Sequence, residues 1–226
     1  MGVIINPRGA SGAGKTELAR RVMAMYGWPG GVEPVYRDGR RRPLCCRLPH
    51  PGGGRPLVVL GHYEVTSGGC DTIGDLDEIF RLAGDYASRG HDVLFEGLLV
   101  SHDHERSARL AEAHELHVLH LSTPLDQCLR QVVARRRARR DVRPLISRTT
   151  AAQHASVAEA CDRLRRCANV ETVAFPRALL RIRELLGLGL PRMHWQPVDE
   201  ASLPAAGLRL EPLTSTPALF QLASQR

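Results

Sequence analysis

The fold of this 226-residue chain is decided by eight residues near its N-terminus, Gly9-Ala10-Ser11-Gly12-Ala13-Gly14-Lys15-Thr16. They match the pattern G-x-x-x-x-G-K-[ST] in full. The apolar residues 3–5 precede them as a short buried strand, and residues 16–25 follow with the periodicity of a helix. A strand, a glycine-rich loop and a helix in this order predict a P-loop, in which backbone amides and the helix N-terminus surround a phosphate.

The last two residues of this loop carry its chemistry. Lys15 is the only lysine in a chain whose other 30 basic residues are arginines, which suggests a role that arginine cannot take over. In a P-loop the lysine ammonium reaches the β- and γ-phosphates, and the following hydroxyl, here that of Thr16, is a ligand of Mg²⁺. We therefore expect residues 9–16 to bind ATP together with Mg²⁺.

Strand and helix patterns alternate along the rest of the chain. Apolar runs predict four more strands, at 57–63, 92–97, 116–121 and 170–175. Helical patterns lie between and after them, at 75–89, 104–114, 123–140, 149–167 and 177–186. The alternation predicts an α/β fold with a five-stranded parallel sheet and helices on both faces. We expect one P-loop domain over 1–186 and a tail, 187–226, to which the sequence assigns no role.

Composition excludes several classes of protein. Hydrophobic residues make up 43% and charged residues 24%, which is typical of a globular chain rather than a disordered one. No apolar run approaches the roughly 18 residues that a membrane span requires, and residues 1–7 lack the layout of a signal peptide. The six cysteines contain no C-x-x-C pair. We expect a cytoplasmic protein with reduced thiols and no membrane partner.

The net charge of +7 is concentrated in two arginine-rich segments. Residues 28–56 hold six arginines, and their Asp38-Gly39 pair predicts a basic hairpin inserted between two strands. Residues 130–148 hold eight arginines and follow the fourth predicted parallel strand. Two local basic surfaces favour contact with phosphates. The alternative is an arginine bias imposed by a GC-rich genome.

The second segment is expected to form a lid. Nucleotide kinases with a P-loop carry an arginine-bearing lid at this place, which closes over the triphosphate, stabilises charge on the transferring group and excludes water. We expect Arg135 and Arg139 to point inward. Spacing alone leaves open which arginines face the phosphates.

Three acidic residues follow predicted strands, at the edge where open α/β sheets bind their ligands. Glu96 is expected to hold Mg²⁺ or its water, although a structural carboxylate bonding loop amides is the alternative. Asp71 is expected to be the general base that takes a proton from an acceptor hydroxyl. Its alternative is the N-cap of the next helix, a need that Asp75 could fill alone. Glu64 is the third candidate and could exchange roles with Asp71.

Two adjacent glycines lie in the loop that carries Asp71. Gly68 and Gly69 would allow the backbone to approach a bulky acceptor closely, since glycine has no side chain to obstruct it. The alternative is a plain turn. We expect Glu64, Gly68 and Gly69 to contact the substrate.

The whole arrangement resembles the P-loop kinase superfamily over residues 2–186. Two stretches are similar to bacteriophage 5-hydroxymethyluracil DNA kinases: residues 61–73, GHYEVTSGGCDTI, and residues 93–101, VLFEGLLVS. That resemblance implies an ATP- and Mg²⁺-dependent kinase of thymidine hypermodification. Its acceptor would be the hydroxymethyl group of 5-hydroxymethyluracil in DNA, its partner that DNA, and its setting the cytoplasm of the host cell. It also implies a site role for Gly68, Gly69 and Asp71.

Three other functions remain open on the residues alone. They are a small-molecule kinase of a nucleoside, nucleotide or sugar-like metabolite, a regulatory NTPase, and a zeta-toxin-like kinase of a cell-wall precursor. An acid after the second strand and a single lid favour a kinase over the NTPase. A steep loss of DNA affinity with added salt would favour the DNA kinase over the metabolite kinase.

Overall fold

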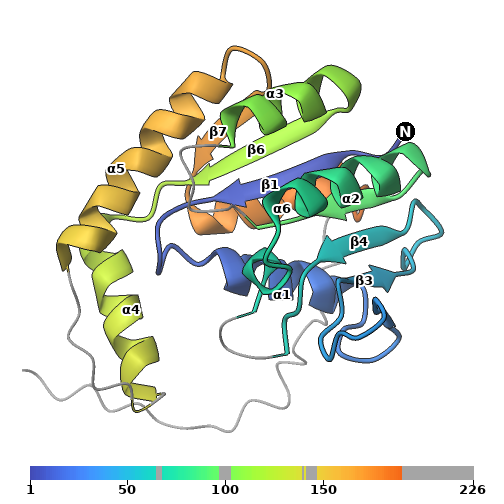
Figure 1. The fold of residues 1–226 in the computed structure, drawn as a ribbon, viewed down its shortest axis with the longest axis horizontal. Coiled ribbons are helices and arrows are strands. Elements are labelled where there is room, and N and C mark those ends of the chain that lie inside the picture. Colours follow the sequence, from blue (N-terminus) through green and yellow to red (C-terminus); the bar gives the residue numbers. More distant parts are fainter. Residues whose placement is uncertain (65–67, 97–102, 139, 141–146, 190–226) are drawn as a thin grey trace, which may run out of the picture. The chain divides into compact units, whose positions relative to one another are not determined.

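A computed structural model describes residues 1–64, 68–96, 103–138, 140 and 147–189 (Figure 1). One compact unit extends over Met1–Leu190. Most of the predicted tail, 190–226, and Arg139 with residues 141–146 of the predicted lid lie outside the described residues. No helix in the described part of the chain is long and apolar enough to cross a membrane.

The sheet contains seven strands in the described residues, ordered β2-β3-β4-β5-β1-β6-β7. Their bounds are β1 Ile4–Arg8, β2 Glu33–Val35, β3 Cys45–Leu48, β4 Leu57–Leu60, β5 Asp92–Leu94, β6 Leu116–Leu121 and β7 Asn169–Val173. Neighbouring strands from β4 to β7 in this order pair in parallel, which confirms the five predicted parallel strands. Strand β3 pairs antiparallel with β4, and β2 antiparallel with β3.

The prediction of a five-stranded parallel sheet is therefore wrong in strand number and in type, because the sheet is mixed. The predicted hairpin forms around the Asp38-Gly39 pair, but β3 continues the sheet beyond β4 instead of standing apart from it. Hydrogen bonds to β3 satisfy the backbone groups of β4 that would otherwise form an open edge.

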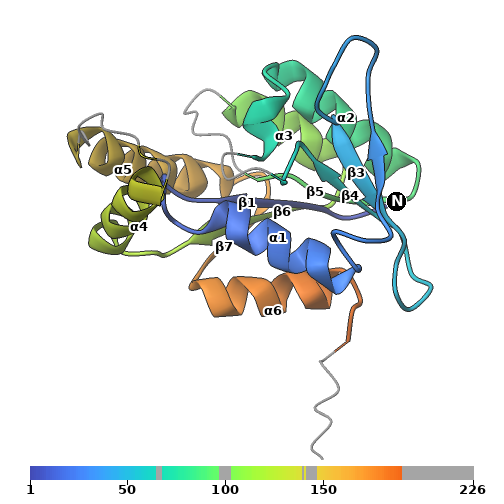
Figure 2. The same ribbon diagram turned by 90° about the horizontal axis from the view of Figure 1, so that it is seen from below.

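Six α-helices in the described residues follow the predicted order. They are α1 Lys15–Met25, α2 Leu76–Ser88, α3 His104–Ala113, α4 Leu125–Ala138, α5 Ser147–Leu164 and α6 Phe175–Leu185. A short 3₁₀ helix, Cys70–Thr72, precedes α2. Helices α1 and α6 cover one face of the sheet, and α2, α3 and α5 cover the other, as Figure 2 shows. The prediction of helices on both faces is confirmed.

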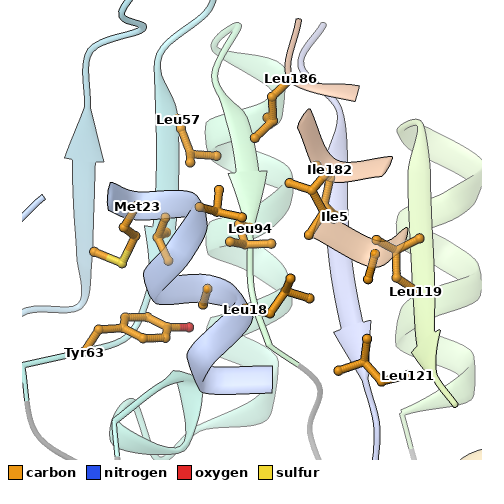
Figure 3. Close-up of a cluster of buried hydrophobic side chains, with 14 of the residues drawn as sticks. Ile5, Leu18, Met23, Leu57, Tyr63, Leu94, Leu119, Leu121, Ile182 and Leu186 are labelled. Carbon is orange, nitrogen blue, oxygen red and sulfur yellow. The ribbon is translucent and has the colours of Figure 1, made fainter. Parts of the chain in front are cut away.

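The strands alternate their side chains between two apolar clusters. Ile5, Val59 and Leu94 face α1 and α6, where they pack with side chains such as Leu18 and Ile182 (Figure 3). Their chain neighbours in each strand face α2, α3 and α5. Parallel strands covered on both faces are apolar throughout, which is why the continuous apolar runs at β4 and β5 could be recognised as strands from the sequence.

The functional edge of the sheet follows from the strand directions. The P-loop follows β1, Glu96 follows β5, and the loop carrying Asp71 follows β4, so all three leave the carboxyl ends of parallel strands. Such ends lie at one edge of a sheet. The fold therefore brings the predicted catalytic segments together.

Strand β1 ends in a buried charged network next to the P-loop. Arg8 is 2% exposed and forms an ion pair with Asp103, which is 1% exposed, through Nη2 and Oδ2 at 2.7 Å. Arg8 also donates to Asn6 Oδ1 at 2.6 Å and to Ser107 Oγ at 2.9 Å. Asn6 in turn donates to the carbonyl oxygen of Phe95 at 2.8 Å. The network joins β1 to the chain that follows β5 and to α3.

Breaking this pair should destabilise the protein strongly. We expect Asp103→Ala to lower the free energy of unfolding by about 3–5 kcal/mol, because it leaves the buried Arg8 guanidinium without a counter-charge. The double variant Arg8→Met, Asp103→Leu should lose much less, since it buries no unpaired charge. Urea unfolding at pH 7 measures both values. Equal losses in the two variants would contradict the role of the ion pair.

Candidate active site

The P-loop takes a shape that only glycine allows at two positions. Gly12 and Gly14 have φ angles of +85° and +99°, in the left-handed region. A Cβ atom on Gly12 would lie 2.3 Å from the carbonyl oxygen of Cys128, so a side chain there would collide with α4. Gly14 is also the N-cap of α1 and offers no side-chain cap. The first amides of the helix are thus left to an anion, as P-loop chemistry requires.

Helix α4 holds the loop from the other side. The Thr123 hydroxyl donates to the carbonyl oxygen of Ala13 at 3.0 Å. His154 Nε2 of α5 lies 3.0 Å from the carbonyl oxygen of Thr123. These contacts connect the P-loop to the residues just before α4 and to α5, the two helices that carry parts of the predicted lid. We did not predict them, because no sequence pattern marks a hydroxyl that bonds a carbonyl 110 residues away.

Lys15 lies over the loop and contacts its carbonyl groups. Its Nζ donates to the carbonyl oxygens of Gly9 at 2.8 Å and of Ala10 at 3.2 Å. Burial lowers the pKa of Lys15, the charges of Glu96 and Asp71 oppose that effect, and the charge of Arg135 adds to it. The ammonium therefore lies within electrostatic reach of both predicted catalytic acids.

Glu96 contacts the residue that follows this lysine. The Thr16 hydroxyl donates to the Glu96 carboxylate, with Oγ1 at 2.9 Å from Oε2 and 3.1 Å from Oε1. Glu96 is 6% exposed, and burial raises its pKa to about 7 against the opposing influence of Lys15 and Thr16. The structure thus brings together the two residues predicted as Mg²⁺ ligands.

The donor set at this point fits a magnesium ion. A hydroxyl and a carboxylate are the hard oxygen ligands that Mg²⁺ prefers, and Mg²⁺ takes its other ligands from phosphates and water. Within the described ranges, no cluster of three or more His, Cys, Asp or Glu side chains gathers around a metal site. A divalent cation held by Thr16 and Glu96 would take its other ligands from nucleotide phosphates and water, as it does in kinases.

The raised pKa of Glu96 predicts how the metal-free protein responds to pH. Folded Glu96 releases its proton near pH 7 and the unfolded residue near pH 4.5, so stability should fall as pH rises between these values. The difference corresponds to about 3 kcal/mol. Glu96→Gln removes this drop, so the variant should match the wild type near pH 4 and exceed it above pH 7.

Urea unfolding at pH 4, 5, 6, 7 and 8 without divalent cations measures the difference between the two proteins. Glu17→Gln on exposed α1 surface is the matched control and should follow the wild type. Glu96→Gln should also lose Mg²⁺-dependent turnover, because it lacks the charge that binds the cation. A constant difference between wild type and Glu96→Gln at all pH values would refute the buried-carboxylate explanation.

Asp71 lies in the 3₁₀ helix Cys70–Thr72, with an exposed side chain. The N-cap of α2 is Asp75, whose carboxylate accepts from the amide of Asp77 at 3.0 Å. Asp71 is therefore not needed as that cap. Its charge opposes the lowering of the pKa of Lys15 and adds to the raised pKa of Glu96, so Asp71 lies within electrostatic reach of both. Its role as the base stays a prediction.

Gly68 and Gly69, the two glycines predicted to contact the substrate, allow close packing of the loop that contains them. A Cβ atom on Gly69 would lie 2.0 Å from Glu96 Oε1, and one on Gly68 would lie 1.9 Å from the carbonyl oxygen of His62. Gly69 has φ +108° and donates its amide to the His62 carbonyl at 2.6 Å. Glycine at 69 therefore lets the acceptor loop, residues 61–73, contact Glu96 directly. Contact of Gly68 and Gly69 with the acceptor stays a prediction.

Glu64 is the third predicted acid of the site. It is exposed, and its charge contributes to raising the pKa of the buried Cys46 thiol. The role of Glu64 in binding the substrate or in replacing Asp71 stays a prediction.

Arg20 is a site residue that we did not predict. Its Nε and Nη2 donate to the carbonyl oxygen of Tyr63 at 3.0 and 2.9 Å, which ties α1 to the acceptor loop. Its charge also lowers the pKa of Glu96. Arg20 lies one helical turn after Thr16, and that spacing is the one signal that could have drawn attention to it.

Most of the described residues of the predicted lid, 130–138, lie on α4, and its last two residues begin α5. Arg135 is exposed near the end of this helix, and its charge lowers the pKa of Lys15. Arg130 forms an ion pair with Asp126 on the same helix. Arg139 lies outside the described residues, so its inward orientation and closure of the lid stay predictions.

The fold and the site together define a class. An α/β sheet with a P-loop after its central strand, a buried carboxylate at the Thr16 hydroxyl and an acid within electrostatic reach of the lysine is consistent with the P-loop kinases.

Comparison with known proteins gives the family. No protein-family model matches the chain. The chain is 38% identical over 163 residues to the 5-hmdU DNA kinase of Pseudomonas phage PaMx11, a match that covers 71% of this chain and 84% of the relative. The chain belongs to the 5-hmdU DNA kinase family, and it is a kinase. This confirms the family inferred from residues 61–73 and 93–101.

Proposed function

We propose that the chain transfers the γ-phosphoryl group of ATP to the hydroxymethyl group of 5-hydroxymethyluracil in DNA, a step in thymidine hypermodification. The observation that carries the proposal is the 38% identity to a 5-hmdU DNA kinase over most of both chains. The site supports it, because a lysine, a buried carboxylate and an exposed acid meet at one edge of the sheet.

The P-loop binds the donor. Residues 9–16 surround the phosphates with backbone amides, and Lys15 exchanges its contacts with the Gly9 and Ala10 carbonyls for the β- and γ-phosphates. Thr16 and Glu96 would hold Mg²⁺, which would neutralise charge on these phosphates. The Thr16 hydroxyl and the Glu96 carboxylate already lie in contact, so binding requires only a local change.

The acceptor loop supplies the base. Asp71 accepts the proton of the acceptor hydroxyl, the hydroxyl oxygen forms a bond to the γ-phosphorus, and the bond from that phosphorus to the bridging oxygen of ADP breaks. Arg135 and Arg139 are expected to stabilise the charge on the transferring group. Gly68 and Gly69 let the acceptor approach, while Glu64 borders it.

The thiols support a cytoplasmic setting. The six cysteines are free, and five of them are buried. Burial raises the pKa of the Cys45, Cys46 and Cys161 thiols, which keeps them protonated and unreactive at neutral pH. We place the enzyme in the reducing cytoplasm of the host cell.

An acceptor comparison tests this function. The protein is incubated with γ-labelled ATP and Mg²⁺ and is offered DNA containing 5-hydroxymethyluracil, unmodified DNA, and the free nucleoside and nucleotide. We expect label in the modified DNA alone. Label in the nucleoside or nucleotide instead would make the protein a metabolite kinase, and hydrolysis of ATP with no labelled acceptor would favour an NTPase.

A further inference from the structure

The tip of the β2–β3 hairpin lies at the same edge of the sheet as the P-loop. The register pairs Val35 with Cys45 and Cys45 with Leu60, which places the connecting residues 36–44 beyond the carboxyl end of β4. Two backbone bonds continue this pairing, from Leu44 to Val35 at 2.8 Å and from Gly61 to Leu44 at 2.7 Å. In Figure 2 this loop is the blue segment beside α2.

The hairpin tip is attached to the segment that carries the proposed base. Arg40 donates through Nη1 to the carbonyl oxygen of Ile73 at 3.0 Å and through Nη2 to that of Thr72. Arg37 forms an ion pair with Glu78 in the first turn of α2 at 2.6 Å. Because Thr72 directly follows Asp71, a ligand held by the hairpin tip is held at a fixed place relative to Asp71.

Three side chains of the tip remain available for a ligand. Tyr36 is 56% exposed, an unusual position for a large aromatic side chain. Arg41 and Arg42 are exposed, and neither has a hydrogen-bond or ion-pair partner in the described part of the chain. Residues 36–42 contain four arginines and one acid, Asp38. The tip thus combines an aromatic ring with two unpaired positive charges.

A general arginine bias does not account for this arrangement. Several exposed arginines on the helices form ion pairs with acids one turn away, as in the pairs Arg21–Glu17, Arg81–Asp85 and Arg130–Asp126. Because each of these arginines is paired with an acid, it adds little to the electrostatic potential around the protein. Arg41 and Arg42 have no such neighbour, so their charge acts on whatever approaches the acceptor loop.

We propose that the hairpin tip, residues 36–42, is a contact surface for the acceptor DNA, on which Arg41 and Arg42 bind backbone phosphates and Tyr36 stacks on a base. The inference rests on the proposed function, and it names the element that positions the DNA beside Asp71. Arginines bind phosphates in any sequence, and base stacking on an aromatic ring is equally tolerant of sequence.

The arginine contacts are tested by the salt dependence of DNA binding. Each phosphate contact adds close to one to the slope of log affinity against log salt concentration, so Arg41→Ala, Arg42→Ala should reduce that slope by about 2. The KM for modified DNA should rise with it. The control is Arg89→Ala, Arg166→Ala, which removes two exposed arginines before β5 and β7, at the opposite edge of the sheet. The control should keep the wild-type slope.

The ring contact is tested with two variants of Tyr36. Tyr36→Ala should weaken binding to modified DNA by about tenfold, whereas Tyr36→Phe should bind as the wild type does, because stacking requires the ring and not the hydroxyl. A wild-type slope in Arg41→Ala, Arg42→Ala would overturn the phosphate contacts. Equal binding of modified DNA by Tyr36→Ala and the wild type would overturn the stacking contact. If the wild type does not phosphorylate modified DNA, the proposed function fails. If the wild type phosphorylates modified DNA and the hairpin variants behave as the wild type does, only this inference fails.

Discussion

Replacing Lys15 with alanine is expected to lower kcat for phosphoryl transfer by about 10²–10³-fold or more, one of the two largest effects expected of a single change in the chain. The ammonium lies over the Gly9 and Ala10 carbonyls, at the place where the β- and γ-phosphates of ATP bind. Charge on the transferring group develops next to it and has no other lysine to stabilise it. Single-turnover transfer to modified DNA at saturating ATP measures the loss.

Two further variants separate charge from geometry. Lys15→Arg keeps the charge, but its planar guanidinium does not fit where a compact ammonium contacts two carbonyls, so we expect it to be impaired as well. Arg109→Ala removes an exposed charge on α3 and should retain full activity. Turnover of Lys15→Ala within tenfold of the wild type would contradict a role for Lys15 at the phosphates.

The second large effect is expected for Asp71→Asn. The amide cannot accept the proton of the acceptor hydroxyl, so kcat should fall by about 10²–10⁴-fold while ATP binding is retained. Asp71 is exposed and Asp75 caps α2, so the substitution should leave the thermal stability unchanged. The kcat of transfer to modified DNA and the Kd for ATP, measured on the same preparation, test both statements.

Glu64→Gln is the matched comparison, because Glu64 is the other exposed acid of the acceptor loop. If Asp71 is the base, Glu64→Gln should keep most of its turnover. Near-normal turnover of Asp71→Asn together with an inactive Glu64→Gln would transfer the role of base to Glu64.

Much of the fold could be predicted because its signals are local. The P-loop pattern and the continuous apolar runs at β4, β5 and β6 identify parallel strands without reference to the rest of the chain. The antiparallel extension was missed for the opposite reason. Strand β2 has three residues, two of them exposed, and its place in the sheet depends on pairing with β3, which the sequence of β2 does not indicate.

The candidate site also contains both features that the sequence predicted and contacts that it did not. The meeting of Lys15, Glu96 and Asp71 follows from a rule of topology, that strands of a parallel sheet present their carboxyl ends at one edge. The contacts of Arg20 with Tyr63 and of Gly69 with Glu96 follow from the tertiary approach of a loop to a helix. No periodicity or motif marks such an approach. Side chains that bond to distant backbone groups therefore became visible only in the structure.

Phosphoryl transfer to one defined base tests the central claim most directly. A DNA duplex with blocked 5′ ends and a single 5-hydroxymethyluracil is incubated with the protein, Mg²⁺ and γ-labelled ATP, beside the same duplex with thymine at that position. The products are then digested with nucleases to nucleoside monophosphates, without a phosphatase, so that the transferred phosphate stays on the base. We predict label on the hydroxymethyl group of the modified base and none in the thymine duplex. Equal label in both duplexes, or label confined to strand ends, would contradict the assignment of this chain as a kinase of 5-hydroxymethyluracil in DNA.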